Sequence, residues 1–131
     1  MKKIMIVSVI CVVLVSAVLL IGRYFFTLNK YKKIISAVVI SDVDLTAVGD
    51  GIYQGSFDAV MIEADVSVTI KKNEIVKINI DKHKNDRGQK AEIITDHVIS
   101  AQSLQVDTIS GATNSSKVIL KAIENALYEK I

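Results

Sequence analysis

A run of hydroxyl-bearing residues near the C-terminus holds the strongest candidates for chemistry in this 131-residue chain. Residues 107–116 read Asp-Thr-Ile-Ser-Gly-Ala-Thr-Asn-Ser-Ser, with two threonines and three serines. A hydroxyl can attack a phosphoryl group in line when an enzyme positions both. Gly111 and Ala112 add little bulk, so the backbone can turn tightly and admit a large partner. The same residue types also cap ordinary helices, and composition alone favours that simpler interpretation.

The order of these residues resembles the Asp-x-x-Ser/Thr-Gly-Ala-Thr flavinylation motif of the FMN-binding domain family. That family includes domains of the sodium-translocating NADH:quinone reductase and of Rnf-type complexes. In them a flavin transferase that uses FAD and Mg²⁺ esterifies FMN phosphate to the motif's last threonine. The resemblance implies that Thr113 carries covalent FMN. The residues that the motif and its flank place at the cofactor are Asp107, Ser110, Gly111, Ala112, Ser115 and Ser116.

The residues after the motif have the period of an amphipathic helix. The apolar positions at this spacing are Val118, Ile119, Ala122, Ile123, Ala126 and Leu127. They predict a helix from about Ser115 to about Glu129, with Thr113 or Ser115 near its N-cap. A phosphodiester at Thr113 would then lie at the positive end of the helix dipole, an interaction worth roughly 0.3–1 kcal/mol when exposed.

The N-terminal segment has the length and composition of a membrane helix. Residues 4–22 contain no charged side chain, and at about 1.5 Å per residue they span about 28 Å, close to the hydrocarbon core of a bilayer. An arginine and three aromatic residues follow at 23–26, as is typical of a membrane interface. A cleaved signal peptide is the alternative, because residues 15–17 form a candidate cleavage site. The apolar run continues beyond that site, which favours an uncleaved anchor.

Charge alone does not orient this anchor. Two lysines and the terminal amine precede it, and four basic residues follow it within positions 23–33. By the positive-inside rule these charges lean toward a cytoplasmic domain. Flavinylated domains of the family are typically outside the cytoplasm, where their transferase works. The resemblance therefore implies a single-pass cell-membrane protein with an extracytoplasmic domain.

Length and charge indicate one small domain on this anchor. We expect a membrane anchor and basic flank over residues 1–33, a connector over 34–48 and an FMN-binding domain over 49–131. The 98 residues after position 33 suffice for one modest core. Ten of the 16 basic residues and all 14 acidic residues lie there, which gives this part a net charge of −4. A nucleic-acid partner is disfavoured, because such a role needs a concentrated basic surface.

The residue types also limit what the domain can do unaided. Cys11, the only cysteine, lies within the apolar run, so we expect no disulfide, thiol nucleophile or thiolate metal site in the domain. His83 and His97 have no partners at metal-ligand spacing, and no Ser, His and Asp arrangement suggests hydrolysis. We therefore predict no catalytic residue and no metal site. Any redox chemistry must come from a bound cofactor.

The pattern between anchor and motif predicts an α+β domain with an antiparallel sheet and two or more helices. Residues 52–57 follow an Asp-Gly turn signal and read as a strand. Segments 66–70 and 76–80 alternate apolar and polar residues around a polar turn, which predicts a hairpin with Val76 on the apolar face. The remaining expectations are a helix over 87–102, an extended segment over 104–109 and, over 34–45, either a helix or a strand.

Residues 50–55 strengthen the resemblance to the family, and residues 83–88 depart from it. Residues 50–55 match the Asp-Gly-x-Tyr-x-Gly that opens domains of the family, so the resemblance extends roughly over 49–127. Larger members carry a His-x-Glu-Thr-Pro-Gly-like loop that lines the flavin, of which residues 83–88 keep only the first and last residues. The resemblance thus puts His83 at the flavin and leaves the other noncovalent contacts open. Tyr53 is available either to stack on the isoalloxazine ring or to fill the core.

Basic residues near His83, namely Lys84, Arg87 and Lys90, either supply positive charge near the flavin phosphate or form a solvated loop. The resemblance implies an electron carrier, matured by the flavin transferase, that relays electrons from a membrane donor to an external acceptor beside the lipid surface. No substrate pocket is evident, which argues against a complete enzyme. Two alternatives stay open: a flavin-free anchored module that binds another envelope component, and a subunit of a multi-subunit oxidoreductase. The sequence names neither electron donor nor acceptor.

Overall fold

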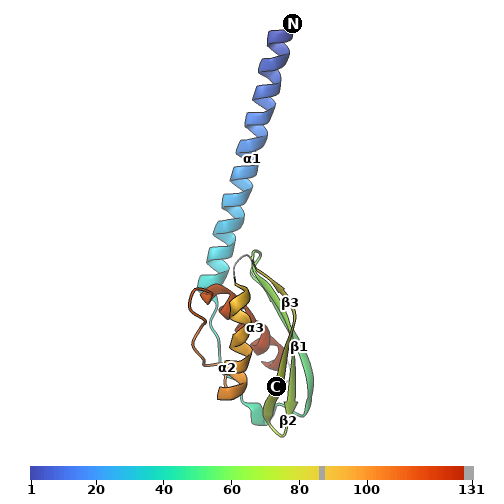
Figure 1. The fold of residues 1–131 in the computed structure, drawn as a ribbon, viewed down its shortest axis with the longest axis vertical. Coiled ribbons are helices and arrows are strands. Elements are labelled where there is room, and N and C mark those ends of the chain that lie inside the picture. Colours follow the sequence, from blue (N-terminus) through green and yellow to red (C-terminus); the bar gives the residue numbers. More distant parts are fainter. Residues whose placement is uncertain (86–87, 129–131) are drawn as a thin grey trace.

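The computed structural model describes residues 1–85 and 88–128, and it shows a long helix, α1 (Lys2–Ala37), leading into a small α+β domain (Figure 1). The elements that follow α1 are η1 (Leu45–Ala47), β1 (Gly51–Asp58), β2 (Glu63–Lys71), β3 (Glu74–Lys84), η2 (Gln89–Ile93), α2 (Ile94–Ala101) and α3 (Thr113–Tyr128). The predicted fold class, an N-terminal apolar helix followed by an α+β domain with an antiparallel sheet, is confirmed.

Helix α1 contains the apolar run and continues well beyond it. Its 36 residues form one element, and the apolar side chains of its first part are exposed. The helix is long and apolar enough to cross a membrane, by length and composition. Residues 34–45 fitted either a helix or a strand in the sequence. The structure gives 34–37 to α1, and an extended connector and η1 follow.

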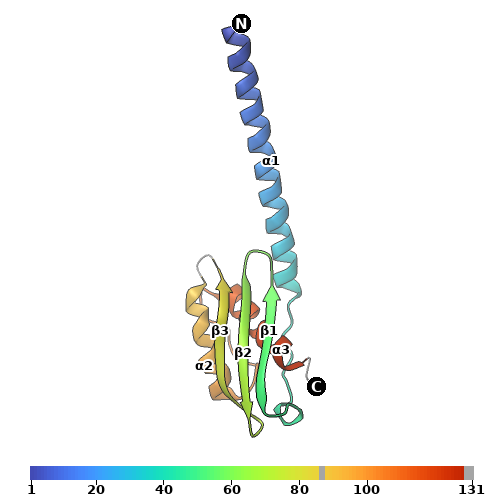
Figure 2. The same ribbon diagram turned by 90° about the vertical axis from the view of Figure 1, so that its right-hand side faces the viewer.

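The three strands form one antiparallel sheet in chain order. Helix α3 packs on β1 and β2, and α2 packs on β3. Both helices lie behind the sheet in Figure 2. Strands alternate their side chains between two faces, so one apolar face can be covered by helices while the other meets solvent. The core residues include Val66, Val68, Ile70, Ile78, Ile94, Val98, Ile119, Ile123 and Leu127.

The sheet and α3 approach most closely at Gly55. A Cβ atom at this position would overlap the carbonyl oxygen of Ala122 and the amide nitrogen of Ala126. Only glycine therefore lets the backbone of α3 rest directly on β1. Asp50 has a different structural role, because its carboxylate accepts the Lys72 N–H at 2.7 Å and ties the start of β1 to the β2–β3 turn.

The predicted hairpin is confirmed, with two register shifts in the pairing of β2 with β3, one between Asp65 and Val66 and one between Thr69 and Ile70. The second falls within the predicted segments, and the alternation does not reveal it. Ile70 pairs with Ile75, whereas the preceding residue of β2 pairs with Lys77, so Val76 is an extra residue in β3. A bulge of this kind changes the face on which the next side chain lies. Val76 is 45% exposed and Ile75 is buried. The expectation that Val76 lies on the apolar face is therefore wrong.

The helix predicted over residues 87–102 is shorter and less regular than expected. It begins as the 3₁₀ element η2 and continues as α2, and Arg87 lies outside the described residues. Gln102 ends it with a φ of 51°, in the left-handed region. The Gln102 side chain accepts the N–H of Ile75 at 2.7 Å and donates to the carbonyl oxygen of Ile75 at 2.9 Å. This pair of bonds fixes the end of α2 to β3.

The connector after α1 is fastened to the domain. The Ser41 N–H donates to the Glu124 carboxylate at 3.3 Å. Asp42 accepts the Leu104 N–H at 3.0 Å and the Ser103 hydroxyl at 2.7 Å. Burial opposes ionisation of Asp42, but the hydrogen bonds from Leu104 and Ser103 outweigh it and lower the pKa of this carboxyl. These bonds hold α1 in a defined position relative to α3.

Candidate functional site

The segment before α3 is a tight turn held by Gly111 and Ser116. The Ala112 N–H donates to the Ile109 carbonyl at 2.9 Å, and Gly111 has a φ of 74° that favours glycine. The Ser116 hydroxyl is buried, donates to the Ala112 carbonyl at 2.8 Å and accepts the Ile109 N–H at 3.0 Å. The buried Ser116 hydroxyl thus bonds to both ends of the turn, at Ile109 and at Ala112.

Thr113 is the first residue of α3, and its side chain is exposed. Ser115 and Ser116 are 2% and 0% exposed, so an incoming enzyme cannot reach their hydroxyls in the folded domain. The motif's other exposed hydroxyl is that of Ser110. The first N–H groups of a helix have no intrahelical acceptors and favour an anionic group nearby. The helix start therefore presents an accessible hydroxyl where a phosphate is electrostatically favoured.

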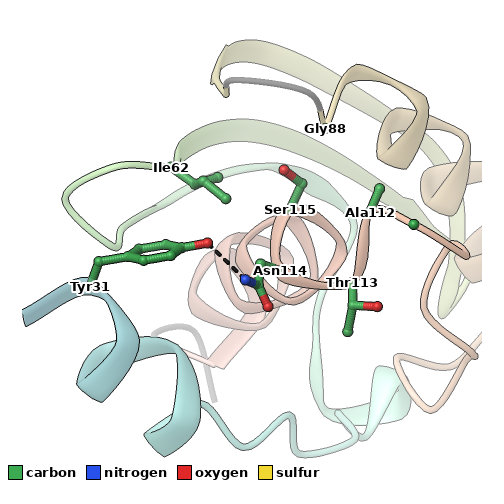
Figure 3. A pocket seen from close by; sticks show the side chains of 8 residues that line it. Tyr31, Ile62, Gly88, Ala112, Thr113, Asn114 and Ser115 are labelled. Carbon is green, nitrogen blue, oxygen red and sulfur yellow. Dashed lines mark hydrogen bonds between the residues drawn. The ribbon is translucent and has the colours of Figure 1, made fainter. Parts of the chain in front are cut away.

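A pocket of about 350 Å³ opens at this helix start (Figure 3). Its lining residues are Tyr31, Ile62, Gly88, Gly111, Ala112, Thr113, Asn114 and Ser115. The volume lies toward the lower end of the range for small-molecule sites, about 300–1,000 Å³. An aromatic ring, an aliphatic side chain, small residues and an exposed hydroxyl meet here. This set of groups fits a flat ring system attached through a phosphate.

Tyr31 brings helix α1 into this site. Asn114 Nδ2 donates to the Tyr31 hydroxyl at 2.9 Å, and Figure 3 shows the ring reaching from α1 toward α3. Sequence reasoning missed both residues because they are 83 positions apart. The signals available were a tyrosine within the basic flank of the anchor and an asparagine directly after Thr113.

The residues before α2 complete the site. Gly88 packs so closely on Ser115 that a Cβ atom there would overlap the serine side chain. The Gly88 N–H donates to Asn85 Oδ1 at 3.0 Å, which fixes this approach. A Cβ atom on Gly111 would lie 2.6 Å from Lys90 Nζ, so the Lys90 ammonium lies beside the turn at Gly111. Lys90 is near the turn and exposed, and its role beside a phosphate stays a prediction.

Five predicted site residues do not line this pocket. Ser110 and Ser116 belong to the turn and to the first turn of α3, and the other three are Tyr53, His83 and Asp107. The Tyr53 hydroxyl donates to the Gly49 carbonyl at 2.7 Å. The His83 side chain is 2% exposed, and its Nδ1 lies 3.0 Å from Glu92 Oε1. Asp107 is exposed and its carboxylate forms no hydrogen bond with the residues that the structure describes. A role for these three residues at the flavin stays a prediction.

Lys84 and His97 do not line the pocket either. Lys84 Nζ donates to the Val60 carbonyl at 3.2 Å, at the β1–β2 loop. His97 is exposed on α2. Within residues 1–85 and 88–128, no group of three or more His, Cys, Asp or Glu side chains is arranged to hold a metal ion.

Comparisons with known proteins bear on the same region. Residues 62–128 match the family model of the FMN-binding domain. A protein of Treponema pallidum (strain Nichols) described as uncharacterized is 29% identical over 83 residues, covering 61% of this chain and 23% of that protein. The NADH:acrylate oxidoreductase of Vibrio harveyi is 35% identical over 65 residues, covering 47% of this chain and 6% of that protein. The chain thus spans less than a quarter of either relative, and no solved structure matches it.

The family match contains the turn over residues 109–112, Thr113 and most of the residues that line the pocket. It begins at Ile62, so β1 lies outside the matched residues although it pairs with β2 in the same sheet. The predicted domain boundaries stay a prediction. Because the match covers just over half of the 131 residues, the chain belongs to the FMN-binding domain family.

Proposed function

We propose that this chain is a membrane-anchored flavoprotein that carries FMN by a phosphoester bond to the Thr113 hydroxyl. The observation that carries the proposal is the position of Thr113, exposed at the first residue of α3 beside a pocket of about 350 Å³. The hydroxyls of Ser115 and Ser116 are buried. Family membership supports the cofactor, and this difference in exposure supports the choice of hydroxyl.

The residues around the pocket would hold the group in distinct ways. The N–H groups at the start of α3 and the Lys90 ammonium favour a phosphate next to Thr113. Tyr31 offers an aromatic face and Ile62 an apolar side chain for a ring. FMN, when bound, supplies one- and two-electron redox chemistry that no side chain of the domain provides.

Attachment needs little from this chain beyond presentation of the hydroxyl. The transferase would move the FMN phosphoryl group of FAD to Thr113 Oγ1, so a new P–O bond forms and the bond between the two phosphates of FAD breaks. AMP leaves, and the hydroxyl proton passes to a base on the transferase, with Mg²⁺ balancing the phosphate charge. The exposed position of Thr113 leaves room for that enzyme.

We also propose that α1 spans the cell membrane once, with the domain outside the cytoplasm and within reach of the transferase. The length and apolar composition of α1 support the span. Electrons would pass from a membrane donor through the flavin to an external acceptor. A tether in the same membrane raises the effective concentration of such partners.

A second candidate function is that of a subunit of a larger oxidoreductase. The observation that favours it is the similarity to a 65-residue part of NADH:acrylate oxidoreductase, a much longer protein. The chain would then pass electrons only beside a partner that binds the substrate. Stable co-purification with such a partner would distinguish this role from an independent carrier.

Electron flux in membranes tests the carrier role. Membranes that contain the transferase and either the wild type or Thr113→Ala receive NADH, while flavin absorbance and reduction of external ferricyanide are recorded. We expect the substitution to abolish the part of the flux that depends on this chain. Ser110→Ala, which removes the other exposed hydroxyl of the motif, is the matched control and should behave as the wild type. Equal flux in wild type and Thr113→Ala would show that the chain is no carrier.

A further inference from the structure

The β1–β2 loop lies beside α1 at the end of the sheet nearest the apolar run (Figures 1 and 2). An open groove of about 740 Å³ separates them, and Val60 is the lining residue that the domain contributes. On the α1 side the lining includes Val18, Leu19, Gly22, Arg23, Phe26 and Lys30. The first three of these belong to the apolar run of residues 4–22. One residue of the folded domain therefore shares a groove with the membrane-spanning part of the helix.

The position along α1 sets the depth of Val60. The run of residues 4–22 spans about 28 Å, close to the hydrocarbon thickness, so Gly22 lies at the outer edge of that layer. The headgroup layer adds about 6 Å on each side, which corresponds to about four further residues of a helix. Phe26 falls within this layer. Val60 lines a groove whose α1 residues run from Val18 to Lys30, with Gly22, Arg23 and Phe26 near the middle. With the proposed span of α1, Val60 would therefore lie near the level of the lipid headgroups.

The loop itself is uncharged and has a fixed shape. Residues 59–62 read Ala-Val-Met-Ile. The Ala59 N–H donates to the Ile62 carbonyl at 2.8 Å, and the Val60 N–H donates to the Asp58 carboxylate at 2.6 Å. Val60 has a φ of 75°, which β-branched residues rarely adopt. These bonds therefore hold Val60 in place against its own conformational preference.

Cationic side chains border this apolar loop. Arg23 and Lys30 line the groove, and Lys84 Nζ donates to the Val60 carbonyl. Apolar side chains bordered by lysine and arginine are typical of surfaces that contact anionic phospholipid headgroups. Two carboxylates flank the loop as well, but Asp58 accepts the Val60 N–H and Glu63 is paired with Lys82 at 3.0 Å. Arg23, Lys30 and Lys84 therefore match lipid phosphates better than they match a second apolar helix.

We propose that the β1–β2 loop is a membrane-contacting element, in which Val60 lies among the phospholipid headgroups beside α1. The inference rests on the proposed anchoring by α1 and does not need the flavin. It adds an orientation to the proposed function, because Ile62 at the other end of the loop lines the pocket at Thr113. The loop would hold that pocket at the membrane surface, where partners embedded in the same bilayer can reach it.

Fluorescence quenching by lipid tests this contact in the full chain. In a Cys11→Ala background, a single cysteine at Val60 or at Asn73 carries a bimane label in vesicles of phosphatidylcholine and phosphatidylglycerol with brominated acyl chains. Asn73 is the matched control because it lies in the β2–β3 turn at the opposite end of the sheet. We expect severalfold greater quenching at Val60 than at Asn73. Met61→Cys repeats the measurement without changing the residue of positive φ.

The native Cys11 separates failure of this inference from failure of the anchoring. Label on wild-type Cys11 reports the middle of the apolar run. Quenching at Cys11 with none above the Asn73 level at either loop position would overturn the loop contact while leaving the anchor intact. No quenching at Cys11 would overturn the anchoring and the inference with it. Loop labels shielded from both brominated lipid and aqueous iodide would show that another protein surface covers the loop, which also contradicts lipid contact.

Discussion

Thr113 and Ser116 lie three positions apart and use the same chemical group for different purposes. The Ser116 hydroxyl is buried and joins the two ends of the turn, whereas the Thr113 side chain is exposed. Residues three apart share one side of a helix, so the helical period does not separate them. Thr113 is the first residue of α3, at the open end of the helix, whereas Ser116 lies almost one turn further in, where it bonds to Ile109 and Ala112. Exposure to solvent, more than residue type, thus distinguishes Thr113, the proposed acceptor, from Ser116, whose hydroxyl stabilises the turn.

Substitution of each hydroxyl should separate these roles. Ser116→Ala leaves the Ile109 N–H without its partner, so we expect the free energy of unfolding to fall by about 1–3 kcal/mol. Thr113→Ala should change it by less than about 0.5 kcal/mol, as is usual for an exposed side chain. Urea unfolding in detergent micelles, followed by circular dichroism, measures both. An equally large loss for Thr113→Ala would mean that its hydroxyl supports the fold.

At this scale the sequence predicts part of the site. The motif points to Thr113 because its residues are contiguous in the chain. Tyr31 could not be assigned in this way, and for Lys90 the sequence left two interpretations open. Tyr31 reaches Asn114, and Lys90 reaches the turn at Gly111, only through the folding of other elements. The burial of Ser115 is likewise a consequence of its packing on Gly88.

Among the elements, the packing of α3 on the sheet decides where the turn before Thr113 lies. Gly55→Ala would force the backbone of α3 away from β1, because the new Cβ atom would overlap Ala122 and Ala126. Overpacking of this kind costs about 1–3 kcal/mol, and we expect the midpoint of thermal unfolding to fall accordingly. Gly22→Ala is the control, since a Cβ atom there meets nothing within 4 Å. Equal midpoints for the two variants would show that α3 does not need this close approach.

The elements that the sequence predicts well are those with a strong local period. The strands and the terminal helix follow from alternation and from helical spacing, and α3 starts at Thr113, two residues earlier than expected. The bulge at Val76 and the end of α2 at Gln102 depend on partners in other elements. The same holds for the connector, whose hydrogen-bond partners lie far away in the chain.

Over the whole molecule, helix α1 and the domain are joined by more than a flexible tether. The connector is bonded to the segment before the turn through Asp42, and Tyr31 of α1 is bonded to Asn114 of α3. The proposed flavin site therefore has a set position relative to the proposed membrane span. The sequence indicates both an anchor and an acceptor motif, but only the fold brings them side by side.

The hydrogen bonds that Asp42 accepts from Leu104 and Ser103 should be sensitive to acid. The pKa of this carboxyl is lowered in the folded chain, so its stabilising contribution is present above the unfolded pKa of about 3.9 and is lost as the pH falls through the folded pKa. We expect Asp42→Asn to lower the free energy of unfolding by about 1 kcal/mol at neutral pH, a modest loss because the group is largely exposed. The difference from wild type should vanish below the folded pKa.

Urea unfolding at neutral pH and in acid measures this dependence. Asp96→Asn is a suitable control, because Asp96 is an exposed carboxylate on α2 that bonds no other side chain in the part of the chain that the structure describes. If the difference in free energy of unfolding between Asp42→Asn and wild type stays constant with pH, the substitution acts through changed packing or hydrogen bonding and not through the loss of the carboxylate charge.

The central claim is that Thr113 carries FMN, and mass spectrometry of the intact chain and its peptides tests it most directly. The wild type, Thr113→Ala and Ser110→Ala are each produced with a flavin transferase, FAD and Mg²⁺. We expect the wild type and Ser110→Ala to gain the mass of one FMN less water, on the peptide that contains Thr113, and Thr113→Ala to gain none. Covalent FMN that persists in Thr113→Ala, or a wild-type label that maps to Ser110, would contradict the account.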